Sequence, residues 1–509
     1  MGDVISAPAC CVAVRALDAA GGYRALLARI ARTRDFWLLE SALESPRLGR
    51  WSFAGAGALA LLRANGNRIE IEPRRRADAQ LVAAGTRAAD PFEALRALVP
   101  VAPSDADAAA IPFVGGAVGW LGYELAARLE RVPIRSGGDV AAPDAAWLLV
   151  DRALAFEHAS GRLFATALGF GASERAASLA AERNAESLAA RIARGDVDPF
   201  EAGSRTHPSG VDERRAGAEP LQWRDAATGL ELGAFFDADA YAKAVTQIRD
   251  EILAGEVYQA NLTQRLAARF GGDAWRLYEA LRARSPAPFA AFLEIPELAV
   301  VGSSPERFLR VERDGRVESR PIKGTRPRGA TPDDDARLVA ELLASEKERA
   351  ENAMIVDLVR NDLGRVCAPG SVAVPELFAI ESYATVHQMV STVTGRLRAG
   401  RDRIDLLRAA FPPGSMTGAP KIAAIALLAK LEPVPRGVYA GALGWLDARG
   451  GMDLSVVIRT ILCRGRRAWL HVGGGIVLDS DPRAEWEETL AKARAMIDAL
   501  ADCQEEPPT

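Results

Sequence analysis

Lys323 lies in a loop rich in glycine and proline, residues 321–329 (PIKGTRPRG), between a predicted strand and a predicted helix. Loops in such positions often carry chemistry. A lysine attacks an electrophile only as the neutral amine, which burial or a neighbouring cation would favour. Glu306, 17 residues upstream across a predicted hairpin, is a candidate for the partnering acid. Taken alone, a loop lysine is more often a surface or phosphate-binding residue.

Two pairs of glutamates share one spacing, Glu348 with Glu351 and Glu485 with Glu488. Residues three apart lie on one face of a helix, so each pair concentrates negative charge there. If the two faces converge they need a cation, and a set of oxygen ligands suits Mg²⁺. The alternative is two solvated faces whose charge is balanced by neighbouring bases. Those bases are Lys347, Arg349 and Lys492.

Two glycine-rich segments could bind an anion, residues 472–476 (VGGGI) and 414–421 (GSMTGAPK). The second segment is not a Walker loop, because the Gly-Lys-Ser/Thr order is missing. Tyr439 and Arg459 are predicted to lie on strands, where they could hold a carboxylate. The alternative is that the glycines form turns and the arginine is merely paired with an acid.

The elements that must position these residues have local signals of their own. Residues 331–335 (TPDDD) are typical of a helix start, with a hydroxyl cap, a proline and acids in the first turn. The helical pattern that follows breaks near Ser345, and residues 485–500 form the last helix. Residues 436–447 and 452–462 are predicted to form a hairpin.

Earlier in the chain the signals are shorter. Strands are predicted at residues 36–40, 147–150, 258–266, 299–302 and 308–311. Helices are predicted at residues 23–31, 91–98, 172–195 and 237–254. Residues 196–225 show little periodicity, so we expect a surface loop or linker there.

The composition of the 509 residues excludes several classes of protein. The net charge is −4 with acids and bases interspersed, which argues against nucleic-acid binding. No apolar run reaches the roughly 18 residues that a membrane-spanning helix needs. No secretion signal is recognisable, so we expect a cytoplasmic protein. The 5 cysteines form no CxxC and the 4 histidines are scattered, so we expect free thiols and no zinc site.

The motifs together are far more specific than any one alone. In chain order they are residues 304–308 (SPERF), 348–366 (ERAENAMIVDLVRNDLGRV), 414–421, 437–444 (GVYAGALG), 457–460 (VIRT) and 485–493 (EWEETLAKA). In this combination the sequence resembles the chorismate-using enzymes that include anthranilate synthase component I and aminodeoxychorismate synthase component I. The resemblance covers about residues 237–496. Residues 38–41 (LLES) and 115–123 (GGAVGWLGY) are similar to the first domain of that family.

The resemblance implies an organisation and a fold. We expect residues 10–170 to form an N-terminal region like that of anthranilate synthase component I. Residues 171–236 would be a helix and linker, and residues 237–496 the chorismate-binding catalytic region. The implied fold is mixed α/β (α+β), a large sandwich of antiparallel β-sheets covered by helices.

Within the family, the residue at position 323 separates two activities. Anthranilate synthases typically carry Ala there and aminodeoxychorismate synthases Lys, as here. Residues 258–264 (YQANLTQ) and 385–388 (TVHQ) also resemble the latter, and Gln259 stands where members that add water at C2 carry a Lys. The resemblance therefore implies a transferase of the transaminase class, which makes 4-amino-4-deoxychorismate for p-aminobenzoate and folate synthesis. The alternatives are anthranilate synthase component I and a catalytically silent relative that binds tryptophan or a partner.

The resemblance also implies roles for single residues. Lys323 would attack C2 of chorismate as a covalent nucleophile, and Glu306 would protonate the departing C4 hydroxyl. His387 would line the site. Mg²⁺ would be held directly by Glu351 and Glu488, with Glu348 and Glu485 close by or acting through water. The residues expected to hold the substrate are Thr417, Tyr439, Arg459, Gly474 and Lys492.

Two partners follow from the same resemblance. Ammonia in this family normally comes from a glutaminase, and the sequence has no cysteine in a Gly-x-Cys-x-Gly elbow. A separate glutamine amidotransferase subunit is therefore implied. Leu39, Glu40 and Ser41 resemble part of the family's tryptophan site, which here would be regulatory, structural or empty.

Overall fold

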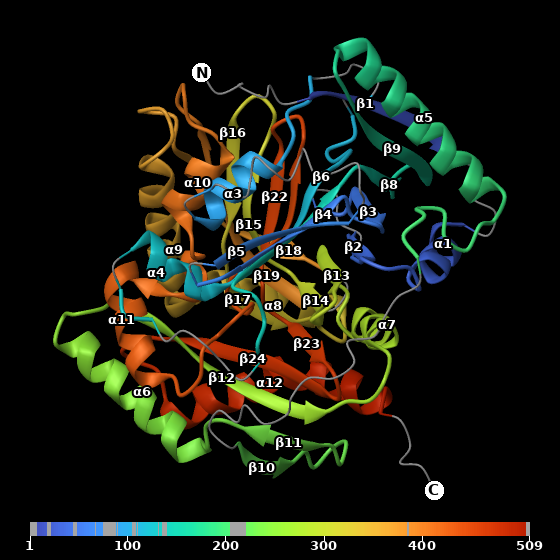
Figure 1. Cartoon of the computed structure of the whole chain (residues 1–509). Coiled ribbons are helices and arrows are strands. Elements are labelled where there is room, and N and C mark those ends of the chain that lie inside the picture. Colours follow the sequence, from blue (N-terminus) through green and yellow to red (C-terminus); the bar gives the residue numbers. More distant parts are fainter. Residues whose placement is uncertain are drawn as a thin grey trace, which may run out of the picture.

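The structure is a computed structural model that describes most of the chain. The described residues are 8–17, 22–43, 48–66, 68–74, 88, 90–103, 108, 110–130, 132–134, 140–203, 220–383 and 386–504. Within them the chain forms two large antiparallel β-sheets with helices packed around them (Figure 1). This confirms the mixed α/β fold expected from the sequence.

The larger sheet has 13 strands among the described residues. In spatial order they are β1 (Ala9–Leu17), β9 (Arg162–Gly171), β8 (Arg152–Glu157), β3 (Trp51–Gly55), β2 (Trp37–Glu40), β13 (Phe289–Ile295), β14 (Leu298–Ser304), β23 (Thr460–Arg464), β24 (Arg467–Ile476), β12 (Gln259–Arg269), β11 (Glu231–Ala234) and β10 (Leu221–Arg224), with β20 (Gly418–Ala419) beside β12.

The second sheet has 11 strands in the same part of the chain. In spatial order they are β17 (Ile322–Pro327), β19 (Val386–Arg396), β16 (Arg316–Arg320), β15 (Arg307–Val311), β22 (Met452–Val456), β21 (Ala442–Asp447), β6 (Gly116–Leu121), β7 (Ala145–Val150), β4 (Ala60–Asn65) and β5 (Arg68–Pro73), with β18 (Ala373–Ser382) beside β19. Strands from the N-terminal region expected at residues 10–170 and from residues 237–496 therefore share both sheets.

Helices pack on both sheets. Those on the larger sheet are α1 (Gly22–Ile30), α5 (Glu174–Ala193), α6 (Ala238–Leu253), α7 (Ala274–Arg284), α11 (Lys421–Leu431) and α12 (Pro482–Asp502). Those on the second sheet are α3 (Pro91–Leu98), α4 (Ala126–Leu129), α8 (Pro332–Ala344), α9 (Glu346–Gly364) and α10 (Arg403–Ala410). In the described part of the chain, no helix is long and apolar enough to cross a membrane.

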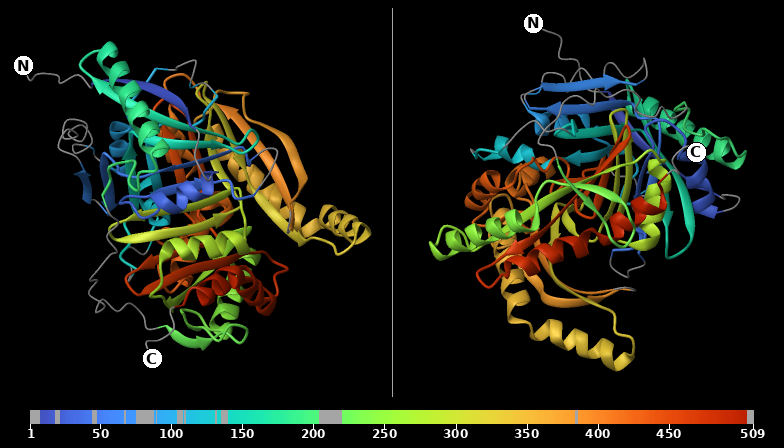
Figure 2. Two further views of the ribbon diagram at one scale, coloured as in Figure 1. Left: turned by 90° about the vertical axis from the view of Figure 1, so that its right-hand side faces the viewer. Right: turned by 90° about the horizontal axis from the view of Figure 1, so that it is seen from below.

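The apolar core has a layer between the sheets and further layers beneath the helices. Trp37 and Phe53 from the larger sheet and Trp120 and Trp445 from the second sheet belong to one buried cluster. Removing such large aromatic surfaces from water supplies much of the driving force for folding. Helix α8 is the exception among the long helices, because Leu342 is the one residue that it buries. Figure 2 shows α8 and the neighbouring strand β18 projecting from the body of the molecule.

The helix signals are confirmed at their ends. The Thr331 side chain accepts a hydrogen bond from the Asp334 amide, and Pro332 occupies the first turn of α8. The expected break falls at Ser345, which ends α8 and caps α9 by accepting from the Glu348 amide. Capping side chains satisfy amides that have no partner inside the helix, so these polar residues fix where the helices begin.

The predicted hairpin is wrong at both outer ends. Strands β21 and β22 pair as expected, but residues 437–440 form a turn in place of a strand. After β22 the chain leaves the second sheet, and β23 pairs in the larger one. Tyr439 and Arg459 therefore lie in irregular segments, and Arg459 has a φ of 51°, which is rare for a residue other than glycine.

The linker prediction is wrong in part. Residues 204–219 lie outside the described residues. Residues 221–224 form β10, which pairs with β11 at the edge of the larger sheet. Strand β10 is mostly exposed and short, so its sequence lacks the buried alternation that marks a strand.

A buried network ties the turn that carries Tyr439 to its surroundings. Arg436, directly before this turn, donates to both carboxylate oxygens of Glu432, at 2.9 and 2.6 Å. It also donates to the carbonyl oxygens of Met416 at 2.6 Å and Asn261 at 2.7 Å. Its backbone amide donates to Glu124 Oε1 at 2.8 Å. One guanidinium thus joins α11, β12 and the loop after α10.

We expect Arg436→Met to destabilise the protein strongly, because it leaves the Glu432 carboxylate buried without its cation. Breaking a buried pair in this way costs about 3–5 kcal/mol. Arg360→Met is the matched control, since Arg360 pairs with Asp357 on the exposed face of α9 and such pairs contribute about 1 kcal/mol or less. Urea denaturation measures both, and equal losses of stability would contradict the role of Arg436.

Candidate active site

Lys323 lies on β17, at the edge of the second sheet. It faces the glycine-rich end of β24 in the larger sheet. A methyl group on Gly475 of β24 would lie 3.2 Å from Lys323 Nζ and 2.3 Å from Gln259 Nε2. Gln259 begins β12, the neighbour of β24. Only glycine leaves room for these two side chains. The glycines of the 472–476 segment therefore keep the space in front of Lys323 open.

Glu306 is the acid beside this lysine. It is buried between β14 and β15, where the positive charge of Lys323 acts on its carboxyl. Burial raises the pKa of Glu306 to about 7, although the Ser415 hydroxyl, the Lys323 amine and the Ile322 amide oppose the change. The carboxyl can therefore hold or release a proton near neutral pH, as a general acid must. Ser415 lies in the 414–421 loop, whose role for Glu306 the sequence did not reveal.

The four glutamates gather from α9 and α12. Glu351 and Glu485 are buried, and Glu485 and Glu488 approach the same glycine of β24. A methyl group on Gly474 would lie 2.9 Å from Glu485 Oε2 and 3.7 Å from Glu488 Oε1. Glu348 lies over Gly324, the residue after the lysine. The structure thus brings both acid pairs next to the strands that carry Lys323 and Gln259.

Each glutamate also has a basic neighbour. Glu348 pairs with Arg326 at 3.4 Å and Glu488 with Lys492 at 2.6 Å, while Lys347 lies 4.0 Å from Glu351 and 3.8 Å from Glu485. Lys347 and Lys492 are two of the three bases expected from the sequence. Arg349 instead stacks over the Phe378 ring. The partner Arg326 was missed, although it lies in the 321–329 loop.

These charges shift the acids in opposite directions. Burial raises the pKa of Glu351 and of Glu485, with neighbouring glutamates adding to it. Burial also acts on Glu488, but Lys492 and the other lysines outweigh it and hold the pKa of Glu488 below its usual value. The two buried glutamates, Glu351 and Glu485, therefore have too little positive charge around them. A divalent cation would supply that charge.

A magnesium ion fits this cluster in the kind of ligand, because all four side chains offer carboxylate oxygens. The present spacing is wider than one coordination sphere. Among the described residues, no three acids, histidines or cysteines are gathered closely enough to hold an ion together. Glu351 and Glu485 both lie near Lys347, and Glu485 and Glu488 both lie near Gly474. These three acids are therefore the residues that could move together to bind a cation.

The expected carboxylate-binding residues surround the same strands. Burial lowers the pKa of Arg459, and Tyr439 is the one titratable side chain that counters this effect. No described carboxylate forms an ion pair with Arg459, so its positive charge is available to an anionic ligand. Tyr439 stacks on His471, with ring centres 5.1 Å apart. Lys492 donates to the Gly473 carbonyl at 2.9 Å.

Two other predicted residues are engaged locally. The Thr417 hydroxyl donates to the Gly414 carbonyl at 3.1 Å, within its own loop. His387 is fully buried, with Ser382 Oγ 2.8 Å from Nδ1 and Asp335 Oδ1 2.9 Å from Nε2. Strand pairing sets His387 opposite Arg326, three residues along β17 from Lys323. Its neighbour Thr385 lies outside the described residues.

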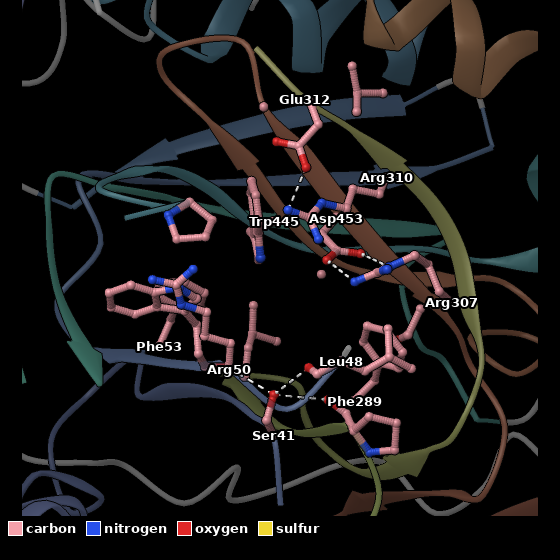
Figure 3. A pocket seen from close by; sticks show the side chains of 18 of the residues that line it. Ser41, Leu48, Arg50, Phe53, Phe289, Arg307, Arg310, Glu312, Trp445 and Asp453 are labelled. Carbon is pink, nitrogen blue, oxygen red and sulfur yellow. Dashed lines mark hydrogen bonds and ion pairs between the residues drawn. The ribbon is translucent and has the colours of Figure 1, made fainter. Parts of the chain in front are cut away.

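The residues that resemble a tryptophan site line a separate cavity. Leu39, Glu40 and Ser41 border a space of about 600 Å³ between the two sheets (Figure 3). The Glu40 carboxylate is already bound by Arg24, Tyr278 and Arg282, so it holds the cavity wall. The Ser41 hydroxyl lies 2.9–3.4 Å from three carbonyl oxygens. Those oxygens belong to Leu48, Trp51 and Pro288.

Comparison with known proteins shows the family of this chain. Residues 42–498 match the family described as chorismate binding enzyme. Aminodeoxychorismate synthase of Streptomyces griseus is 44% identical over 388 residues, which are 76% of this chain and 50% of the relative. Aminodeoxychorismate synthase component 1 of Klebsiella aerogenes is 40% identical over 399 residues, 77% of this chain and 78% of the relative. This chain thus spans about half the length of the Streptomyces griseus relative.

A solved structure shows the same fold. Anthranilate synthase component I from Streptococcus pneumoniae TIGR4 superposes with a TM-score of 0.69 at 27% identity, covering 89% of this chain and 93% of that one. The expected resemblance is thereby confirmed over nearly the whole length. The chain belongs to the chorismate binding enzyme family.

Proposed function

We propose that this chain replaces the C4 hydroxyl of chorismate by an amino group taken from ammonia, making 4-amino-4-deoxychorismate. The observation that carries the proposal is that Lys323 lies near enough for its charge to act on Glu306, a buried acid whose pKa is raised to about 7. A nucleophile beside a general acid is what displacement of a hydroxyl requires. The chemistry is a transfer of nitrogen, and its product is a precursor for p-aminobenzoate and folate.

The reaction runs in two displacements. The neutral Lys323 amine forms a bond to C2, the ring double bonds shift, and the C4–oxygen bond breaks. Glu306 gives its proton to that oxygen, which leaves as water. Ammonia then bonds to C4, the double bonds shift back, and the bond between C2 and Lys323 breaks as the amine recovers. Holding the two partners in contact removes much of the entropic barrier to each step.

The remaining residues hold and polarise the substrate. Arg459, Tyr439, the Gly474 amide and Lys492 bind the two carboxylates. Glu351 and Glu488 would hold Mg²⁺, with Glu348 and Glu485 close by, and the ion would supply positive charge to the ring carboxylate. Gln259 offers an uncharged amide beside Lys323, and its Oε1 has no hydrogen-bond partner among the described residues. His387 supports β17 through its contacts with Asp335 and Ser382.

The supply of ammonia is assigned to a glutamine amidotransferase on a separate chain. The relative from Klebsiella aerogenes is named component 1, which supports a second component. We place the protein in the cytoplasm, where its thiols stay reduced. This is supported by the cysteines, none of which forms a disulfide bond: Cys10, Cys11, Cys367, Cys463 and Cys503.

Lys323→Ala is expected to abolish formation of 4-amino-4-deoxychorismate from chorismate, ammonium and Mg²⁺. The wild-type protein mixed with chorismate alone should gain a covalent adduct on Lys323, seen by intact-protein and peptide mass spectrometry. Lys243→Ala, which removes an exposed lysine from α6, is the matched control and should keep both results.

Product analysis separates this proposal from anthranilate synthase component I, the activity of the Streptococcus pneumoniae relative. Fluorescent anthranilate as the sole product would contradict amination at C4. Failure to consume chorismate would favour a catalytically silent relative that binds tryptophan or a partner. An unchanged rate in Lys323→Ala would exclude covalent catalysis while leaving the product assignment in place.

The acid role of Glu306 predicts a pH dependence. Because its pKa is raised to about 7, the proton is present below that pH and lost as the pH rises through it. Both the wild type and Glu306→Gln need a neutral Lys323, so the effect of Glu306 shows in the ratio of their rates of adduct formation without ammonia. Glu306→Gln should be slower by about 100- to 10,000-fold near or below pH 7, and this ratio should shrink about tenfold per unit as the pH rises above 7. A ratio that stays level to pH 9 would rule this role out.

For the cavity between the sheets we propose tryptophan as the ligand. Three carbonyl oxygens around Ser41 suit an ammonium group, and Arg310, Arg313 and Arg316 offer positive charge to a carboxylate. Phe53, Phe289 and Trp445 give an aromatic lining for an indole (Figure 3).

The protein is first denatured, and any small molecule that it releases is identified by mass spectrometry. Calorimetric titration with tryptophan then tests whether the cavity binds this ligand. Trp445→Ala should weaken binding about tenfold or more, because it removes apolar contact area. Activity with and without tryptophan then separates a regulatory site from a structural one. If denaturation releases no tryptophan and none binds at millimolar concentration, tryptophan is not the ligand of this cavity.

A further inference from the structure

Lys347 places one ammonium group between acids that come from two helices. It belongs to the first turn of α9, where it reaches Glu351 one turn further along at 4.0 Å. Across the gap it reaches Glu485 of α12 at 3.8 Å. The lysine side chain is 49% exposed, whereas the glutamate side chains are 9% and 5% exposed. A half-exposed cation thus lies beside two buried carboxylates.

The outer members of the cluster have other partners. Glu348 is drawn toward Arg326, and Glu488 is held by Lys492. Among the described contacts, Lys347 is therefore the one basic side chain that bridges the two helices through these acids. The Glu351 carboxylate has no hydrogen-bond donor in the described part of the chain, so its charge depends on nearby cations.

We propose that Lys347 is the counter-cation of the metal-free site and must withdraw when Mg²⁺ enters. This rests on the Mg²⁺ of the proposed function. The ammonium group and a divalent ion repel each other at these distances, so both cannot occupy the gap between Glu351 and Glu485. The flexible lysine stem on an exposed turn lets the group move into water at small cost.

Two consequences follow for the free protein. Lys347 competes with Mg²⁺, so the metal binds less tightly than the acids alone would allow. It also offsets the charge of Glu351 and Glu485 on the two sides of the gap, and thereby stabilises the arrangement of α9 and α12 before metal or substrate arrives. Lys347 is a positioning residue in this scheme, since it acts on the glutamates and is not assigned a contact with chorismate.

Lys347→Met keeps most of the side-chain volume and removes the charge. In calorimetric titrations without chorismate, its Kd for Mg²⁺ should be about tenfold lower than that of the wild type. In EDTA its thermal midpoint should be lower than the wild-type value, and saturating Mg²⁺ should remove the difference. Lys347→Arg should behave like the wild type in both measurements. Lys243→Met, which removes the same charge from α6, should change neither.

Each outcome bears on a separate claim. Equal or weaker Mg²⁺ binding in Lys347→Met, with measurable binding in the wild type, overturns the inference and leaves the metal assignment intact. A loss of stability that Mg²⁺ does not restore also overturns it, because the lysine would then be purely structural. Wild-type protein that binds no Mg²⁺, with or without chorismate, removes the metal assignment and this inference together. Amination at C4 is tested independently by the analysis of the product formed from chorismate and ammonium.

Discussion

Two neighbouring segments of the chain, residues 298–311 and 452–464, pass from one sheet into the other at the same place. The geometry of the candidate site depends on this double crossing. Strand β14 pairs with β23 in the larger sheet, while their continuations β15 and β22 pair in the second. At the crossing the Ser303 amide donates to the Arg459 carbonyl, and the Val456 amide donates to the Glu306 carbonyl, each at 3.0 Å. The buried acid and the free guanidinium are thus set by backbone hydrogen bonds, which hold functional groups more rigidly than surface loops do.

Local signals were sufficient for the helices. A hydroxyl at Thr331, a proline after it and a second hydroxyl at Ser345 placed the ends of α8 and α9, because capping depends on neighbours in sequence. They were not sufficient for Tyr439 and Arg459. Both were expected on strands, since apolar residues continue through residues 436–462. Whether a strand stays in its sheet or bends into another is decided by long-range pairing, which no short pattern records.

The candidate site shows the same division. The spacing of the glutamates predicted two acidic faces and named Lys347 and Lys492 as neighbours, and both neighbours are present. What spacing could not give is that Lys347 faces two helices at once. Likewise the family resemblance implied that His387 lines the site, while only the structure shows that its ring contacts Asp335 and Ser382. Side-chain direction across distant elements is a tertiary property.

Glu306 and Arg307 are consecutive, and successive residues of an extended chain point to opposite sides. Glu306 is buried on the side where the charge of Lys323 acts on it, whereas Arg307 lies in the wall of the large cavity and donates hydrogen bonds to Asp453 and Glu318 (Figure 3). The candidate site and the cavity are therefore joined by a single peptide unit. Substitutions that change the ligand of the cavity would therefore also disturb the position of Glu306. Keeping Arg307 and Asp453 constant makes the two compartments separable for selection.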